Sequence, residues 1–143
     1  MNKVLMIVPV IVTLISAACG ASPEPSAVGK VVSVGGGSYK NVNAQDVQAM
    51  LEDKDFTFVN VHIPFEGDIP NTDLSIPFDQ VDQNLGLLPA DKDAKIVLYC
   101  RSGNMSSTAS ETLVNLGYSN VWNLDGGFNA WKAAGFPMEG INQ

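Results

Sequence analysis

Cys100 is the residue of this sequence best placed to do covalent chemistry. It follows residues 95–99, whose β-branched and aromatic side chains are typical of a strand buried on both faces of a parallel sheet. The turn residues Arg101 to Asn104 come next, and residues 105–116 have the apolar spacing of a helix. A strand, a short polar turn and a helix direct successive backbone N–H groups at one point. A thiolate at that point would be stabilised by these amide dipoles and by the guanidinium of Arg101.

Two other interpretations of Cys100 have to be weighed. A lone cysteine at the end of a core strand is commonly a small buried hydrophobe. Cys100, however, is followed directly by an arginine and opens a turn that contains Gly103, and the other cysteine, Cys19, lies in a leader-like segment. A cysteine phosphatase would need the spacing Cys-x5-Arg, and Ser106 stands where that arginine must be. We therefore expect a reactive thiol that does not serve phosphoryl transfer.

The sequence around Cys100 resembles the rhodanese (sulfurtransferase) family. That family has the pattern Cys-Arg-x-Gly-x-x-Ser/Thr after a central strand, matched here by Cys100, Arg101, Gly103 and Ser106. A second family signature is matched downstream by Leu116-Gly-Tyr118, Asn120–Gly127, Ala130-Trp131 and Gly135-Phe-Pro137. The looser resemblance extends from residue 39 to residue 137.

The resemblance implies covalent catalysis in which Cys100 is the catalytic residue. Its thiolate takes sulfane sulfur from a donor such as thiosulfate or a persulfide, and the resulting persulfide passes the sulfur to a thiophilic acceptor. No cofactor is implied, and neither the single histidine nor any carboxylate run has the spacing of a metal site. A persulfide carrier or sulfur-binding module with little turnover remains the alternative. The substrate-binding residues implied by the loop are Arg101, Ser102, Gly103, Asn104, Met105 and Ser106.

Met105 bears on the choice of donor. Many family members that use thiosulfate efficiently have a basic residue at this loop position, whereas this sequence has a thioether. The expected partners are small sulfur-containing anions or persulfides, and the less charged persulfides should be favoured over thiosulfate because Arg101 alone offers a positive charge. The sequence does not identify the thiol or protein that accepts the sulfur.

The loop after the strand at 56–61 departs from the family pattern. At the positions of the usual Asp-Val-Arg, a following Glu and Gly-His-Ile, this sequence has Asn60-Val-His62, Glu66 and Gly67-Asp-Ile69, so the Asp and Arg are replaced while the Glu is kept. We expect His62 to be a strand-end histidine at the surface without a catalytic role, because nothing in the sequence orients it towards Cys100.

Strands that alternate with helices predict an α/β fold, and the resemblance implies a rhodanese-like parallel sheet of about five strands with helices on both faces. With 143 residues, of which 45% are hydrophobic, the sequence fits one globular domain, expected over residues 39–143 and most simply monomeric. A helix capped by Asn43 is expected, and the helix after Cys100 should bury Ala109, Leu113 and Leu116 and end at Gly117. Gly126 and Gly127 could bind a phosphate, but close packing beside the cysteine loop is the favoured interpretation. Further elements are expected as a possible short strand at 30–34, strands at 39–42, 75–77 and 120–124, and helices over 79–85 and after 125–127.

The first residues have the features of an export signal. The positively charged Lys3, twelve mostly apolar residues at 4–15 and Ser16-Ala-Ala18 predict a signal peptide over residues 1–18. The apolar run is too short to span a bilayer. Cys19 then resembles the lipidated cysteine of bacterial lipoproteins, with residues 19–38 as lipidated N-terminus and linker, although plain cleavage after Ala18 is the alternative. The expected location is extracytoplasmic and membrane-anchored, facing the periplasm or at the outer membrane if the host is Gram-negative. Removing residues 1–18 would make the net charge of −7 one unit more negative, which disfavours nucleic acid and leaves the lipid as the membrane attachment.

Lipidation of Cys19 can be measured directly. Labelled palmitate should become covalently attached to the protein. The mature protein should also partition into the detergent phase, because two acyl chains suffice for stable anchoring. A mature form that begins at Cys19 with a free amine and stays in the aqueous phase would contradict the prediction.

Overall fold

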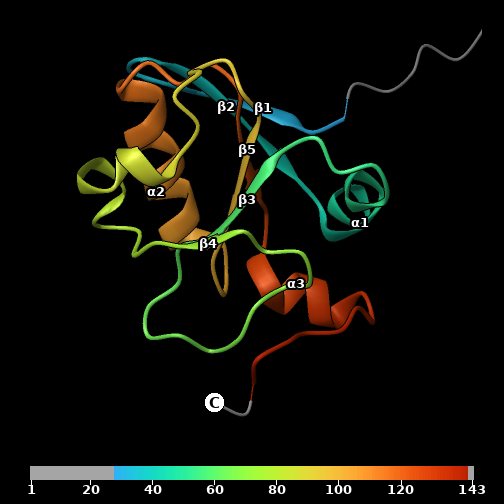
Figure 1. Cartoon of the computed structure of the whole chain (residues 1–143). Helices are drawn as coiled ribbons and strands as arrows, with labels where there is room; N and C mark the ends of the chain where they lie inside the picture. The colour runs from blue at the N-terminus through green and yellow to red at the C-terminus, as the bar shows by residue number, and fades with distance from the viewer. Residues whose placement is uncertain (1–27, 142–143) are drawn as a thin grey trace, which may run out of the picture.

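A computed structural model describes residues 28–141 as a six-stranded sheet with helices on both faces (Figure 1). The predicted signal peptide and Cys19 lie outside the described residues. The strands are β1 (Lys30–Val34), β2 (Gly37–Val42), β3 (Thr57–Asn60), β4 (Leu74–Ser75), β5 (Ile96–Tyr99) and β6 (Val121–Leu124). The helices are α1 (Ala44–Glu52), α2 (Asn104–Asn115) and α3 (Gly127–Ala133), with two 3₁₀ turns at Val81–Gln83 and Leu85–Leu87.

The predicted α/β class is confirmed, and five of the strands form the parallel sheet. The strand order is β1-β2-β6-β5-β3-β4, in which every neighbouring pair is parallel except β1 and β2. The possible short strand at 30–34 is confirmed as β1, which pairs antiparallel with β2 from Lys30↔Asn41 to Val34↔Gly37 within the stretch 19–38 that was expected to be linker. The reason is the alternation in 30–34, which turns Val32 and Val34 onto the core while Val31 stays exposed.

Two apolar clusters fill the space between the sheet and its helices. One lies on the α2 side and includes Leu98, Ala109 and Leu113, whereas the other lies on the α1 and α3 side and includes Val47 and Trp131. All four residues of β5 are buried, as expected for a central parallel strand covered on both faces. The strand that leads to Cys100 is therefore held from both sides.

The helix ends follow the predicted capping with one correction. The side chain of Asn43 accepts a hydrogen bond from the Asp46 N–H at 2.8 Å, as expected of an N-cap. At the end of α2, Gly117 has φ +93° and the backbone N–H of Tyr118 reaches back to the carbonyl of Leu113. Leu116 was expected to be buried and is 37% exposed, because the chain turns away from the sheet at this cap.

The predicted helix over 79–85 is wrong. Val81–Gln83 and Leu85–Leu87 are separate 3₁₀ turns with hydrogen bonds between residues three apart. Val81 is the single residue of the two turns that is buried, so the segment has too little apolar face to hold a regular helix. The predicted edge strand at 75–77 is β4, at Leu74–Ser75, and it does lie at the edge of the sheet.

None of the helices within residues 28–141 has the length and apolar character needed to cross a membrane.

Candidate active site

Cys100 lies where the central strand ends. β5 stops at Tyr99, and the neighbouring β3 continues alongside, with the Val61 N–H donating to the Tyr99 carbonyl at 2.8 Å. Cys100 is 1% exposed, so its sulfur sits at the base of the loop that follows. This is the carboxyl edge of the parallel strands, where open α/β sheets bind their ligands.

Hydrogen-bond donors of the loop converge on the sulfur. The backbone N–H of Gly103 donates to Sγ at 3.1 Å. The Ser106 hydroxyl lies 3.4 Å from Sγ and 3.2 Å from the Gly103 carbonyl, so its single proton can be donated to either acceptor. Burial raises the pKa of the Cys100 thiol, but hydrogen bonds from the Ser106 side chain and from the backbone N–H groups of Ser106, Gly103 and Ser102 lower it by more. The pKa therefore lies below the ordinary value of a cysteine, and the loop favours the thiolate.

The remaining loop residues lie outside this ring of donors. Asn104 is the exposed first residue of α2, and Met105 is half-buried against the core. The guanidinium of Arg101 was expected to stabilise the thiolate, but its side chain is 55% exposed and directed to Glu66, with NH1 3.4 Å from Oε2. The lowered pKa of the thiol has its causes in the donors of Ser102, Gly103 and Ser106.

The first turn of α3 fixes the start of the loop. The Phe128 N–H donates to the Cys100 carbonyl at 2.9 Å, and the Asn129 N–H donates to the Arg101 carbonyl at 3.0 Å. These bonds need a close approach of the two backbones: a Cβ on Gly127 would lie 2.2 Å from the Cys100 oxygen. The interpretation of this glycine as close packing beside the cysteine loop is confirmed, and a phosphate is not needed to explain it.

The loop over 62–70 is packed against the same edge through contacts that the sequence did not predict. Asn60 donates its side-chain amide to an Asp68 carboxylate oxygen at 2.8 Å, and Asp68 also accepts from the Tyr99 hydroxyl at 3.1 Å. His62 is 5% exposed and not at the surface, and its Nε2 contacts Glu66. The spacing of four residues between His62 and Glu66, within a loop that departs from the family pattern, is the signal that could have indicated this pair.

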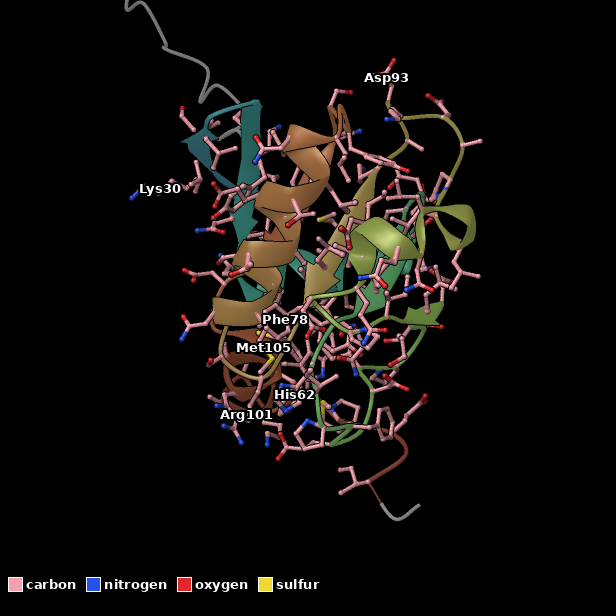
Figure 2. The ribbon with its side chains drawn as sticks, turned by 90° about the vertical axis from the view of Figure 1, so that its left-hand side faces the viewer. Lys30, His62, Phe78, Asp93, Arg101 and Met105 are labelled. Atoms are coloured by element: carbon pink, nitrogen blue, oxygen red, sulfur yellow. The ribbon has the colours of Figure 1, made fainter. Side chains whose placement is uncertain are left out.

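The surroundings of the thiol are mixed in character. Figure 2 shows His62, Arg101, Met105 and Phe78 gathered at one end of the molecule, where the strands end. Phe78 is placed there because its N–H donates to the Val61 carbonyl at 3.1 Å, and both Phe78 and Met105 pack on the α2-side core. An incoming molecule would therefore meet apolar groups as well as the Arg101–Glu66 pair.

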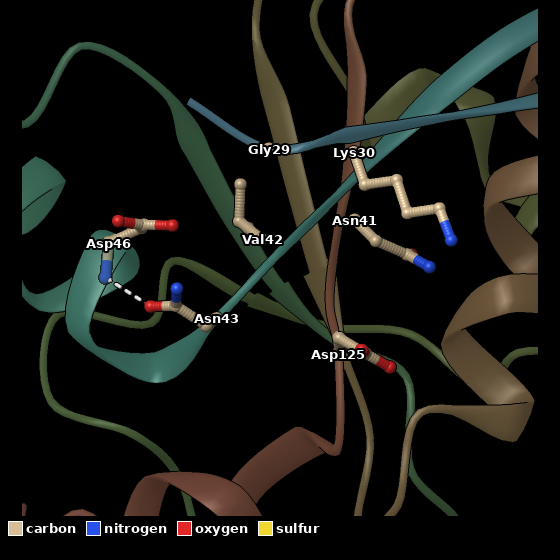
Figure 3. A pocket seen from close by; sticks show the side chains of 7 residues that line it. All are labelled: Gly29, Lys30, Asn41, Val42, Asn43, Asp46 and Asp125. Carbon is tan, nitrogen blue, oxygen red and sulfur yellow. Dashed lines mark hydrogen bonds between the residues drawn. The ribbon is translucent and has the colours of Figure 1, made fainter. Parts of the chain in front are cut away.

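A cavity of about 390 Å³ lies beside the end of β2 and Asp125 (Figure 3). It is lined by Gly29, Lys30, Asn41, Val42, Asn43, Asp46 and Asp125, and none of these belongs to the Cys100 loop. Its floor is the end of β2 and the start of α1, with the Asn43–Asp46 cap at one side. Among residues 28–141, no three His, Cys, Asp or Glu side chains are grouped so that they could hold a metal ion.

Comparisons with known proteins agree with this architecture. A model of the family described as "Rhodanese-like domain" matches residues 43–134. The "Sulfurtransferase" of Allochromatium vinosum is 35% identical over 94 residues, which cover 64% of this chain and 85% of that protein. The crystal structure of a rhodanese-related protein from Thermoplasma volcanium superposes with a TM-score of 0.61 at 30% identity, covering 73% of this chain and 100% of that one.

A second kind of relative is much longer than this chain. The "tRNA uridine(34) hydroxylase" of Erwinia tasmaniensis is 36% identical over 97 residues, which cover 64% of this chain. The match spans only 27% of that protein.

Removing the Ser106 hydroxyl should weaken the thiolate. In Ser106→Ala, burial of the thiol is opposed by one donor fewer, so the midpoint of the pH profile for alkylation of Cys100 should move to higher pH. The rate of reaction with iodoacetamide at neutral pH should fall about three- to tenfold, the net worth of one ordinary hydrogen bond. Mass spectrometry of the Cys100 peptide measures this rate. Thr108→Ala, which removes an exposed hydroxyl of the same helix, is the control, and an unchanged midpoint in Ser106→Ala would contradict the assignment.

A side chain at Gly127 should displace the cysteine loop. Gly127→Ala should lower the free energy of unfolding by about 1–3 kcal/mol, the usual cost of forcing atoms into a packed site. It should also slow the alkylation of Cys100. Gly86→Ala is the matched control, because a Cβ there meets nothing within 4 Å, and it should leave both quantities unchanged. Equal behaviour of the two variants in denaturant titrations would show that the close approach is not required.

Proposed function

Because this chain belongs to the family of rhodanese-like domains, we propose that it is a sulfurtransferase that carries sulfane sulfur on Cys100. The observation that supports this most directly is the set of donors that converge on one buried sulfur, from Gly103 at 3.1 Å and Ser106 at 3.4 Å. Such a cradle stabilises a thiolate, and it would equally stabilise the anionic terminal sulfur of a persulfide.

The proposed reaction has two steps. The Cys100 thiolate attacks the outer sulfur of the donor and forms a new S–S bond, while the donor's own bond to that sulfur breaks. The leaving group departs with the electron pair: sulfite from thiosulfate, or a thiolate from a persulfide. A thiophilic acceptor, such as cyanide in an assay or a thiol, then attacks the terminal sulfur and releases the Cys100 thiolate.

No general base is required for either step. The lowered pKa of Cys100 increases the share of thiolate without a separate proton acceptor, and the same N–H groups stabilise the negative charge each time it returns to the sulfur. The loop therefore acts on the charge of the sulfur, and the proposal assigns Ser102, Gly103 and Ser106 this role.

We further propose that donors of low charge are preferred. Met105 brings no charge to the loop, and the guanidinium of Arg101 is shared with Glu66. A dianion such as thiosulfate therefore gains little electrostatic attraction in an acidic chain with net charge −7. A persulfide donor carries less negative charge, so its binding depends less on electrostatic attraction to the site.

The cellular setting belongs to the proposal as well. Lipidation at Cys19 would hold the domain at a membrane on the extracytoplasmic side, and the acidic composition does not favour RNA. The tRNA hydroxylase relatives are matched over 27% to 32% of their length, so the proposal takes from them the shared domain and not the hydroxylation.

Replacing the thiol tests the proposed function. Cys100→Ser should retain the fold, because the change is nearly isosteric, and should lose sulfur transfer to cyanide from both thiosulfate and glutathione persulfide. The same substitution at the only other cysteine, Cys19→Ser, should retain transfer per molecule. Transfer by Cys100→Ser at the parent rate would remove Cys100 from the mechanism. If the parent protein passes on one sulfur per molecule but does not turn over, it acts as a persulfide carrier.

A further inference from the structure

One carboxylate oxygen near the thiol is shared by two basic side chains. Oε2 of Glu66 is contacted by Nε2 of His62 and lies 3.4 Å from NH1 of Arg101. The contact to Arg101 is long for a hydrogen bond but within the range of an ion pair. Because an ionised carboxylate only accepts hydrogen bonds, we assign Nε2 of His62 as the donor to Glu66.

His62 holds this carboxylate from the protein side. Its side chain is 4% exposed, whereas those of Glu66 and Arg101 are 39% and 55% exposed. The imidazole packs edge-on against Phe128 of α3, with ring centroids 5.4 Å apart. Its other nitrogen, Nδ1, has no hydrogen-bond partner within residues 28–141, so the polar contact that orients the ring is the one to Glu66.

Other charged groups lie in this neighbourhood, and the Asp125 carboxylate is one of them, because its Oδ1 would be 3.9 Å from a Cβ built on Gly103. Asp68 binds the Asn60 amide and the Tyr99 hydroxyl, and the Lys132 ammonium lies 5.0 Å from the centre of the Phe128 ring. Arg101 directly follows Cys100 and is the cation of the loop, and its charge is the one that Glu66 offsets.

We propose that Glu66 sets the charge preference of the site, and that His62 is the positioning residue that keeps Glu66 beside Arg101. The carboxylate reduces the positive potential that Arg101 presents to a molecule approaching Cys100. Anionic reagents are thereby disfavoured relative to neutral ones. For the identity of the substrates this inference rests on the proposed sulfurtransferase function, but the electrostatic effect itself does not.

The effect can be measured without any sulfur chemistry. Iodoacetate and iodoacetamide alkylate the same thiolate and differ in charge, so the ratio of their rates at Cys100 reports the local potential and cancels any change in the thiol pKa. Glu66→Gln should raise the iodoacetate-to-iodoacetamide ratio about three- to sevenfold at low salt, the effect of one charge at about 7 Å and an effective dielectric of about 40–80. The gain should shrink as salt is added.

The matched control removes the same charge elsewhere. Glu52 is exposed at the last turn of α1, at the opposite end of the sheet, and Glu52→Gln should leave the ratio unchanged. A ratio in Glu66→Gln that equals that of Glu52→Gln, or that falls below the parent value, would overturn the role of Glu66.

A double-mutant cycle tests His62. His62→Gln should give a ratio between those of the parent and Glu66→Gln, and it should change nothing further when Glu66 is already glutamine. An equal effect in both backgrounds would show that His62 does not act through Glu66. The turnover number for sulfur transfer should change less than about tenfold in His62→Gln, below the usual effect of a general base.

Donor kinetics then join the inference to function. Glu66→Gln should lower the Michaelis constant for thiosulfate more than that for glutathione persulfide, with the turnover number little changed. Equal changes for the two donors would overturn the link to donor choice. If no variant transfers sulfur, the proposed function fails while the alkylation ratios still decide the roles of Glu66 and His62.

Discussion

The hydrogen bonds that end on the sulfur of Cys100 are the interaction on which the rest of the site depends. Burying a thiol raises its pKa, so a cysteine that is 1% exposed would ordinarily be an inert part of the core. The donors from Ser102, Gly103 and Ser106 reverse that tendency, because the loop presents them to one point as it enters α2. A group that is both buried and charged is stable only where such donors are fixed in place.

The fold supplies that fixed position from three directions. β5 is buried along its whole length and fixes the position of Cys100, which follows it directly. The helix α2 starts immediately after Gly103, whose φ of +98° lets the chain turn. From the other face of the sheet, the first turn of α3 binds the carbonyls of Cys100 and Arg101. Gly127 permits this last contact, since any side chain there would occupy the position of the Cys100 carbonyl. Residues far apart in the sequence thus act together to hold the Cys100 loop in place.

The sequence was most informative where local patterns decide the structure. The apolar run before Cys100, the Asn43 cap and the Gly117 stop each correspond to an element of the fold, because their signals act over a few residues. The helix predicted over 79–85 was wrong, because the small amount of apolar surface that this segment buries, and not its local spacing, limits it to 3₁₀ turns. The contacts of the loop over 62–70 could not be predicted either, because they depend on which side chains β3 and β5 bring together. There, Asn60 donates to Asp68 and His62 to Glu66, so a polar network is formed with side chains that differ from the family pattern.

The central claim is that Cys100 accepts one sulfur atom and that its loop stabilises the product as an anion. The most direct measurement is mass spectrometry of the peptide that contains Cys100, after the full chain has been exposed to glutathione persulfide and the excess donor removed. The peptide should gain the mass of one sulfur atom, and cyanide should remove that mass and release thiocyanate in equal amount. A Cys100 peptide that gains no mass in the folded protein, or an added mass that cyanide does not remove, would contradict the account.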